Sequence, residues 1–126
     1  MAISAAPAGE AHHSIAGVYD STRPVAVQGT VVEFEFVNPH PVLTVNAAAD
    51  GEPAELWRLE MDNRFELSDI GISATTFKPG DRVVVNGSAH RNEARRLYVR
   101  RLERPADGFM YEQVGFRPRV KLAPGN

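Results

Sequence analysis

A long β-type run that changes face part-way along is the feature that most constrains this fold. It spans residues 25–37, and its valines up to Val31 share one phase of the alternation, whereas Val32 and Phe34 share the other. The change of phase follows Gly29, and a glycine at such a point is typical of a bulge or a sharp coil. We therefore expect one strand that bends strongly rather than a flat one.

Four shorter β-type segments and one helical segment follow the first strand. Pro39 and Pro41 end that strand, because each proline removes an amide donor. Alternation or apolar runs then predict strands over residues 43–47, 57–61, 83–85 and 97–102, and a helical pattern predicts one or two turns over 63–72. The fourth strand is expected to end at Asn86-Gly87, and regular structure is expected to end over residues 105–108.

This order of elements predicts a mainly β fold. A coiled first strand, and a short helix between the third and fourth of five strands, indicate a small OB-like barrel. A small β-sandwich is the alternative. With 126 residues the chain has the size of one domain. We interpret residues 1–11 as a leader remnant or tail, 12–108 as the barrel, and 109–126 as an extension that packs on it.

Charge is unevenly distributed along the chain, although the net charge is only −2. Residues 1–77 carry 3 basic and 11 acidic side chains, and residues 78–126 carry 11 basic and 5 acidic ones. A basic half could bind nucleic acid. We instead expect the halves to neutralise each other, with arginines pairing with acids such as Glu60 and Asp62, so nucleic acid is not an expected partner. There is no apolar run of the ~18 residues that a membrane-spanning helix needs.

Histidines are the best candidate ligands in a chain without cysteine. His12 and His13 are adjacent, and His40 lies between two prolines that restrict its loop. Imidazole nitrogen is a common ligand of Zn and Cu. Cleavage after Ala11 would also free the α-amine of His12, and this amine and the rings would suit Cu(II). The alternative is that the first two histidines are solvated and His40 hydrogen-bonds its own loop.

Several short motifs occur in an order that resembles a family of small exported proteobacterial proteins of unknown function. They are His12-His13-Ser14, Gly29-Thr30-Val31, Asn38-Pro39-His40, Trp57, Lys78-Pro79-Gly80-Asp81 and Pro105-Ala106-Asp107-Gly108. The chain departs from the family pattern at Gly71-Ile72, where members have Gly-Trp, and at Asn92-Glu93, where members have a glycine. The resemblance implies a periplasmic address and a leader remnant at residues 1–11. It implies no activity.

The leading hypothesis is a non-catalytic periplasmic binding module that holds a Cu or Zn ion through His12, His13 and His40. A second hypothesis is a module that binds a protein, a peptide or an oligosaccharide at the barrel face or at a strand edge. A third is a small enzyme with a pocket between the barrel mouth and the C-terminal segment. The sequence does not determine the oligomeric state or which partner or small molecule is bound.

Overall fold

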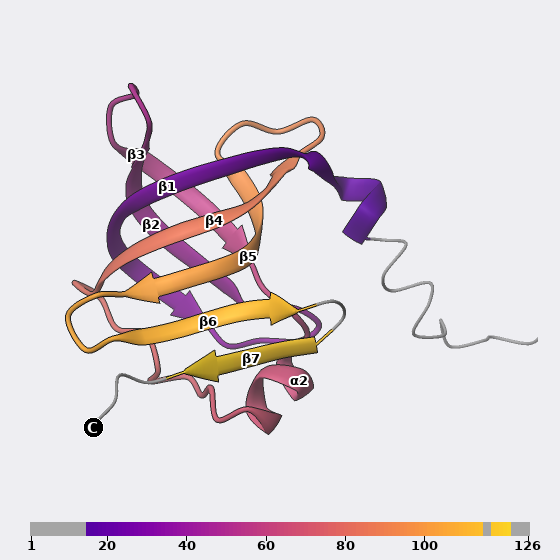
Figure 1. Ribbon diagram of the computed structural model, residues 1–126, viewed down its shortest axis with the longest axis vertical. Coiled ribbons are helices and arrows are strands. Elements are labelled where there is room, and N and C mark those ends of the chain that lie inside the picture. Colours follow the sequence, from indigo (N-terminus) through magenta and orange to yellow (C-terminus); the bar gives the residue numbers. More distant parts are fainter. Residues whose placement is uncertain (1–14, 115–116, 122–126) are drawn as a thin grey trace, which may run out of the picture.

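The structure, a computed structural model, describes residues 15–114 and 117–121 of the chain (Figure 1). A single helical turn over residues 15–18 precedes the first strand. The elements that follow are β1 (Tyr19–Glu35), β2 (Val42–Ala49), β3 (Glu55–Glu60), α2 (Arg64–Asp69), β4 (Arg82–His90), β5 (Arg96–Arg104), β6 (Phe109–Val114) and β7 (Arg117–Lys121). Strands dominate, so the prediction of a mainly β fold is confirmed. No helix among these residues is long and apolar enough to cross a membrane.

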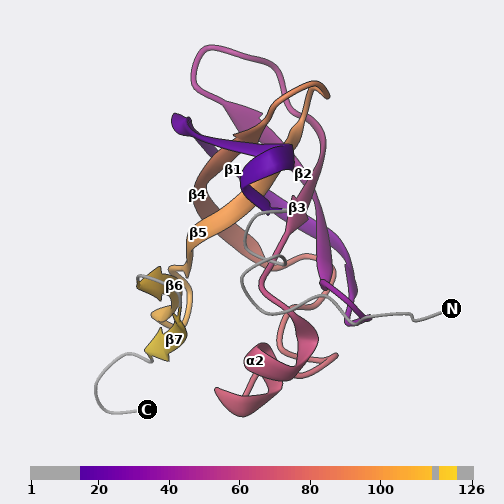
Figure 2. The same cartoon turned by 90° about the vertical axis from the view of Figure 1, so that its right-hand side faces the viewer.

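The first five strands hydrogen-bond in a ring. β1 pairs with β2 and β4, β2 pairs with β3, and β4 pairs with β5, all antiparallel. A parallel pairing between β3 and β5 closes the ring. β6 and β7 continue the sheet from β5 as an antiparallel hairpin, and α2 lies beside them at the lower end of the molecule (Figures 1 and 2). The alternative of a small β-sandwich also fits these strands, which enclose one core.

The predicted change of face in the first strand is confirmed. Val27 and Val31 are each 2% exposed and lie in the core, and the later Phe34 also packs against that core. Between them Val32 is 45% exposed, and the register with β2 shifts between Val31 and Glu33. This bulge lets a single strand direct side chains inward both before and after the bend.

Gly29 allows β1 and β2 to approach closely at the coil. A Cβ placed on Gly29 would lie 2.1 Å from the backbone oxygen of Asn46 and 2.5 Å from the Cα of Ala47. Neither atom can move aside by changing a rotamer, because both belong to the backbone of β2. Only a glycine therefore fits at this position of the ring.

Two predicted ends of regular structure are wrong. β4 does not end at Asn86-Gly87 but continues to His90. Gly87 instead marks a register shift against β5, where a Cβ would lie 2.2 Å from the backbone oxygen of Tyr98, so this glycine marks an irregularity within a strand rather than a turn. Residues 105–108 likewise form a turn that leads into β6 and β7. The predicted division of the chain into segments 1–11, 12–108 and 109–126 stays a prediction.

The predicted helical segment forms a short helix at the lower end of the ring. Asn63 caps α2, since its side-chain oxygen accepts a hydrogen bond from the backbone N–H of Glu66 at 2.9 Å. Leu67 and Ile72 are buried, whereas Phe65 is 73% exposed. Gly71 has a φ of +93°, a conformation that favours glycine just after a helix. The helix thus contributes few side chains to the core.

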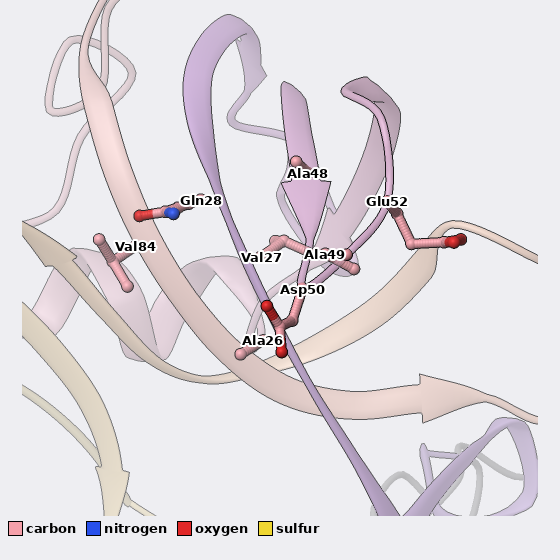
Figure 3. Close-up of a pocket in the computed structure, with 9 residues that line it drawn as sticks. Ala26, Val27, Gln28, Ala48, Ala49, Asp50, Glu52 and Val84 are labelled. Atoms are coloured by element: carbon pink, nitrogen blue, oxygen red, sulfur yellow. The ribbon is translucent and has the colours of Figure 1, made fainter.

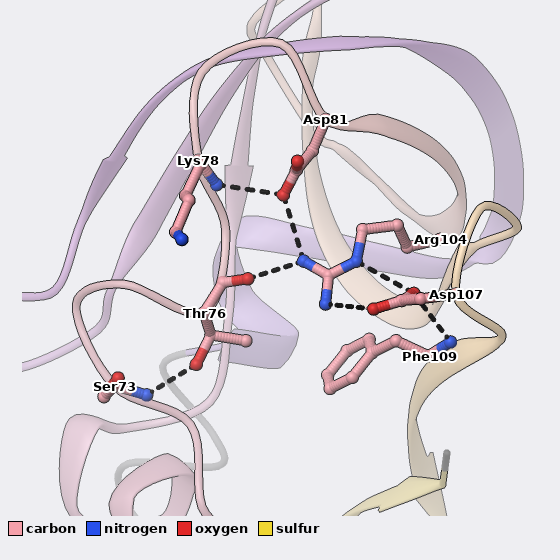
Figure 4. Close-up of polar contacts among 7 residues, drawn as sticks. All are labelled: Ser73, Thr76, Lys78, Asp81, Arg104, Asp107 and Phe109. Atoms are coloured by element: carbon pink, nitrogen blue, oxygen red, sulfur yellow. Dashed lines mark hydrogen bonds and ion pairs between the residues drawn. The ribbon is translucent and has the colours of Figure 1, made fainter. Parts of the chain in front are cut away.

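A single arginine joins two turns that the sequence motifs mark (Figure 4). Arg104 donates from Nη1 to the carbonyl oxygen of Thr76 at 2.5 Å and to Oδ2 of Asp81 at 3.0 Å. Its Nε and Nη2 donate to the two carboxylate oxygens of Asp107 at 3.1 and 2.9 Å. The guanidinium also lies 5.0 Å from the ring centroid of Phe109. The turns at residues 78–81 and 105–108 therefore stabilise the fold through one shared cation.

Candidate metal-binding site

His40 lies in the connection between β1 and β2, next to α2. Its Nδ1 is 2.7 Å from the carbonyl oxygen of Met61. Because a carbonyl oxygen only accepts, Nδ1 carries the proton in this contact, and in a neutral ring the lone pair is then on Nε2. Histidine ligands of metal ions commonly donate their other ring N–H to a carbonyl in this way. The ring is held, and its side chain keeps 21% exposure.

A carboxylate and a phenol lie on the Nδ1 side of His40. Oε2 of Glu60 is 3.9 Å from Nδ1 of His40, and Oε1 of Glu60 accepts a hydrogen bond from the hydroxyl of Tyr19 at 2.7 Å. Burial and the neighbouring Glu60 raise the pKa of Tyr19, so the phenol keeps its proton. Tyr19 is the first residue of β1 and therefore connects the start of the ring to His40 through Glu60.

A second carboxylate, that of Asp62, is 3% exposed and forms the centre of a buried polar cluster. Its Oδ2 accepts from the hydroxyl of Tyr111 at 2.8 Å, and its Oδ1 accepts from Nε2 of Gln113 at 2.7 Å and from the hydroxyl of Tyr98. Burial and the charge of Asp62 raise the pKa of both tyrosines. Arg100 donates to the side-chain oxygen of Gln113. The cluster attaches β6 to the ring.

The expected pairing of arginines with Glu60 and Asp62 is wrong. Both carboxylates are bound by tyrosine hydroxyls, which have an apolar ring that fits the interior better than a guanidinium does. The arginines of the second half pair largely with acids of that half, as Arg104 does. Among the described residues, ion pairs that join the two halves of the chain include Arg91 with Asp20 at 3.6 Å.

The structure tests the predicted metal ligands only in part. His12 and His13 lie outside the described residues. Over residues 15–114 and 117–121, no group of three or more histidine and acidic side chains is arranged to hold a metal ion. Of the predicted ligands, only His40 is placed, and Glu60 is the acidic side chain beside it.

The fourth histidine, His90, has a structural role. Its Nδ1 accepts hydrogen bonds from the backbone N–H groups of Asn92 and Glu93 at 3.0 and 2.9 Å. Its side chain is 8% exposed, and its ring lies edge-on to that of Tyr19 with 5.3 Å between the centroids. His90 thus stabilises the start of the β4–β5 loop, and its buried ring is a poor candidate for a metal ligand.

The Asp62 cluster is the part of this region that sequence reasoning missed. Tyr98 and Tyr111 follow Asp62 in the sequence by 36 and 49 residues, respectively. No local spacing signals such a cluster. The one available signal is an acidic residue directly after a buried strand end, since a carboxylate there needs donors from elsewhere.

A cavity of about 330 Å³ opens on another face, between β1, β4 and the β2–β3 turn (Figure 3). Its lining consists largely of small apolar side chains such as Ala26 and Ala48, with Gln28 and Asp50 as polar groups. Glu52 extends away from the other labelled side chains (Figure 3). A binding pocket usually has several convergent polar groups, and this cavity has few.

Comparison with known proteins gives a family but no activity. The family model that matches is that of a family of unknown function (DUF6152), and the match covers residues 1–97. No curated protein and no solved structure matches the chain.

Proposed function

Since the chain belongs to this family of unknown function, we propose its function from the site itself: a non-catalytic binding module that holds a Cu or Zn ion at His40. The observation that carries the proposal is the hydrogen bond from Nδ1 of His40 to the carbonyl oxygen of Met61 at 2.7 Å. It fixes the ring and assigns the lone pair to Nε2, the nitrogen that a metal ion would take.

The remaining ligands of the proposed site are His12 and His13. They directly precede Ser14 and the helical turn over residues 15–18, after which the side chain of Tyr19 contacts Glu60 beside His40. If a leader is removed after Ala11, the α-amine of His12 becomes a ligand too. An amine and imidazoles together favour the tetragonal geometry of Cu(II), whereas imidazoles alone also suit Zn.

The proposal also includes an OB-like barrel fold and a periplasmic location. The ring order of the five strands, its parallel closure between β3 and β5, and the helix between β3 and β4 support an OB-like barrel. The resemblance of the motifs to exported proteins supports a periplasmic location. Binding of a protein, peptide or oligosaccharide, and a small enzyme, remain the alternative hypotheses.

Titration calorimetry with Cu(II) and with Zn(II) tests the proposal on two forms of the chain, one that starts at Met1 and one that starts at His12. We expect one-to-one binding that is tighter in the form with a free His12 amine. His40→Asn keeps an amide donor for Met61 and removes the ligand nitrogen, so it should reduce the affinity by at least about tenfold.

His90→Asn is the matched control. It removes the imidazole at the end of β4 and keeps a side-chain acceptor for the backbone amides of the β4–β5 loop. It should leave metal affinity unchanged. Unaltered metal binding in a folded His40→Asn protein would contradict the proposed site. Loss of binding in His90→Asn alone would show that the ligand is His90 and not His40.

A further inference from the structure

The β4–β5 loop lies at the end of the ring opposite α2 (Figures 1 and 2), and residues of this loop line a cavity. The cavity has a volume of about 270 Å³ and lies between this loop, the first part of β1 and the half-buried Trp57 of β3. The side chains that matter for its chemistry are Arg23, Pro24, Trp57, Ala94, Arg95 and Arg96. It is separate from His40, whose loop contacts α2 through the hydrogen bond from Arg64 N–H to the oxygen of Pro39 at 3.2 Å.

Positive charge dominates the lining. Three arginines line the cavity, and the acidic side chain among the lining residues is Glu93. Glu93 binds Nη1 of Arg96 at 3.1 Å. Arg95 pairs with Glu55 at 3.6 Å, but both side chains are about half exposed, so solvent weakens this pair. Arg23 makes no ion pair within 4 Å among the described residues.

Two local features of the β4–β5 loop indicate a role in ligand binding. Arg95 has a φ of +58°, a left-handed conformation that is unfavourable for a residue with a large side chain and is found more often at functional sites. Nε of Arg96 is buried and makes no hydrogen bond of normal geometry among the described residues, although the guanidinium also interacts with the hydroxyl of Tyr19. A buried donor without such a hydrogen bond needs an explanation, and a ligand oxygen would supply it.

Apart from the charged residues and His90, the lining of the cavity is apolar. Trp57 packs partly against the core, and Pro24, Val25 and Ala89 lie around the same space. A flat ring would contact the indole and the proline there, while a guanidinium would bind an anionic group through paired hydrogen bonds. The cavity volume of about 270 Å³ lies just below the roughly 300 Å³ at which drug-sized pockets begin. It therefore suits a small ligand with one ring and one anionic group.

We propose that this cavity binds a small organic anion, a flat ring that carries a carboxylate or a phosphate, with Trp57 against the ring and the guanidinium of Arg96 on the anionic group. This site involves none of the proposed metal ligands, so it stands or fails independently of the metal site.

The fluorescence of Trp57 tests the proposal directly, because Trp57 is the only tryptophan of the chain. Phenyl phosphate and benzoate serve as probes, benzyl alcohol as the neutral ring, and inorganic phosphate as the anion alone. We expect a saturable change with at least one ring-bearing anion, and at least about tenfold weaker binding of benzyl alcohol and of inorganic phosphate. The preferred anion distinguishes a phosphate from a carboxylate ligand.

Arg96→Gln should weaken binding of the preferred probe by at least about tenfold. Arg117→Gln, on the exposed strand β7 far from the loop in sequence, is the matched control and should bind as the wild type does. If Arg96→Gln does not fold, Arg23→Gln replaces it, since this side chain is exposed. The proposal is overturned if no ring-bearing anion gives saturation, if inorganic phosphate binds equally well, or if the control loses as much affinity as the folded test variant.

Discussion

Gly29→Ala is the substitution that most directly tests the coiled ring. The added Cβ would lie 2.1 Å from the backbone oxygen of Asn46 and 2.5 Å from the Cα of Ala47, both well inside contact distance. β1 and β2 must then separate where they are hydrogen-bonded on both sides of Gly29. Overpacking of side chains alone costs about 1–3 kcal/mol. Because the clash here is with backbone, we expect a loss of at least about 3 kcal/mol.

Guanidinium unfolding followed by circular dichroism measures this loss, which corresponds to a decrease in Tm of about 10 °C for a domain of this size. Gly17→Ala is the matched control, because the same methyl group meets no atom within 4 Å and lies in the helical turn over residues 15–18. It should leave stability unchanged or raise it by up to about 1 kcal/mol. If Gly29→Ala unfolds within about 0.5 kcal/mol of the wild type, the close approach of β1 to β2 is refuted.

Two further predictions concern the buried cluster and the Arg104 contacts. Tyr111→Phe keeps the ring and removes the 2.8 Å hydrogen bond to the Asp62 carboxylate, so it should lower the free energy of unfolding by about 1.5–3 kcal/mol; a change below about 0.5 kcal/mol would remove Tyr111 from the cluster. Hydrogen bonds from Arg104 lower the pKa of Asp107, so its contribution to stability is present at neutral pH and is lost as the pH falls through that lowered value. The difference in unfolding free energy between wild type and Asp107→Asn should therefore shrink between pH 7 and about pH 2, and an unchanged difference would contradict the ion pair.

The fold could be predicted where the signal is local. The change of phase between Val31 and Phe34 can be predicted from the alternation of apolar residues alone. The role of Gly71 can be predicted from its position just after a helical segment. Gly87 shows where this reasoning fails. After an asparagine it is typical of a turn, but in the structure it avoids a clash with the backbone of Tyr98, a residue of another strand. The sequence does not show which strand lies opposite.

The site can likewise be predicted only where its features are local in sequence, because contacts with distant strands leave no local signal. The two prolines beside His40 indicated a restrained imidazole, and the ring is restrained, although by the carbonyl of Met61 from the end of β3. Opposite charge predicts arginines as the partners of the Glu60 and Asp62 carboxylates. Their partners are tyrosines, since a buried carboxylate can be satisfied by hydroxyl donors without burying a second charge.

The motif residues differ in whether the fold itself explains them. Gly29 allows the strands of the ring to approach, and Asp81 and Asp107 hold Arg104, so packing and ion pairs account for these positions. His40 and Trp57 are each only partly buried. Among the described residues, Nε2 of His40 makes no hydrogen bond, and the indole of Trp57 lines a cavity. A residue that the fold alone does not explain is the better candidate for function. The two proposed sites therefore centre on these two residues, at different ends of the same ring.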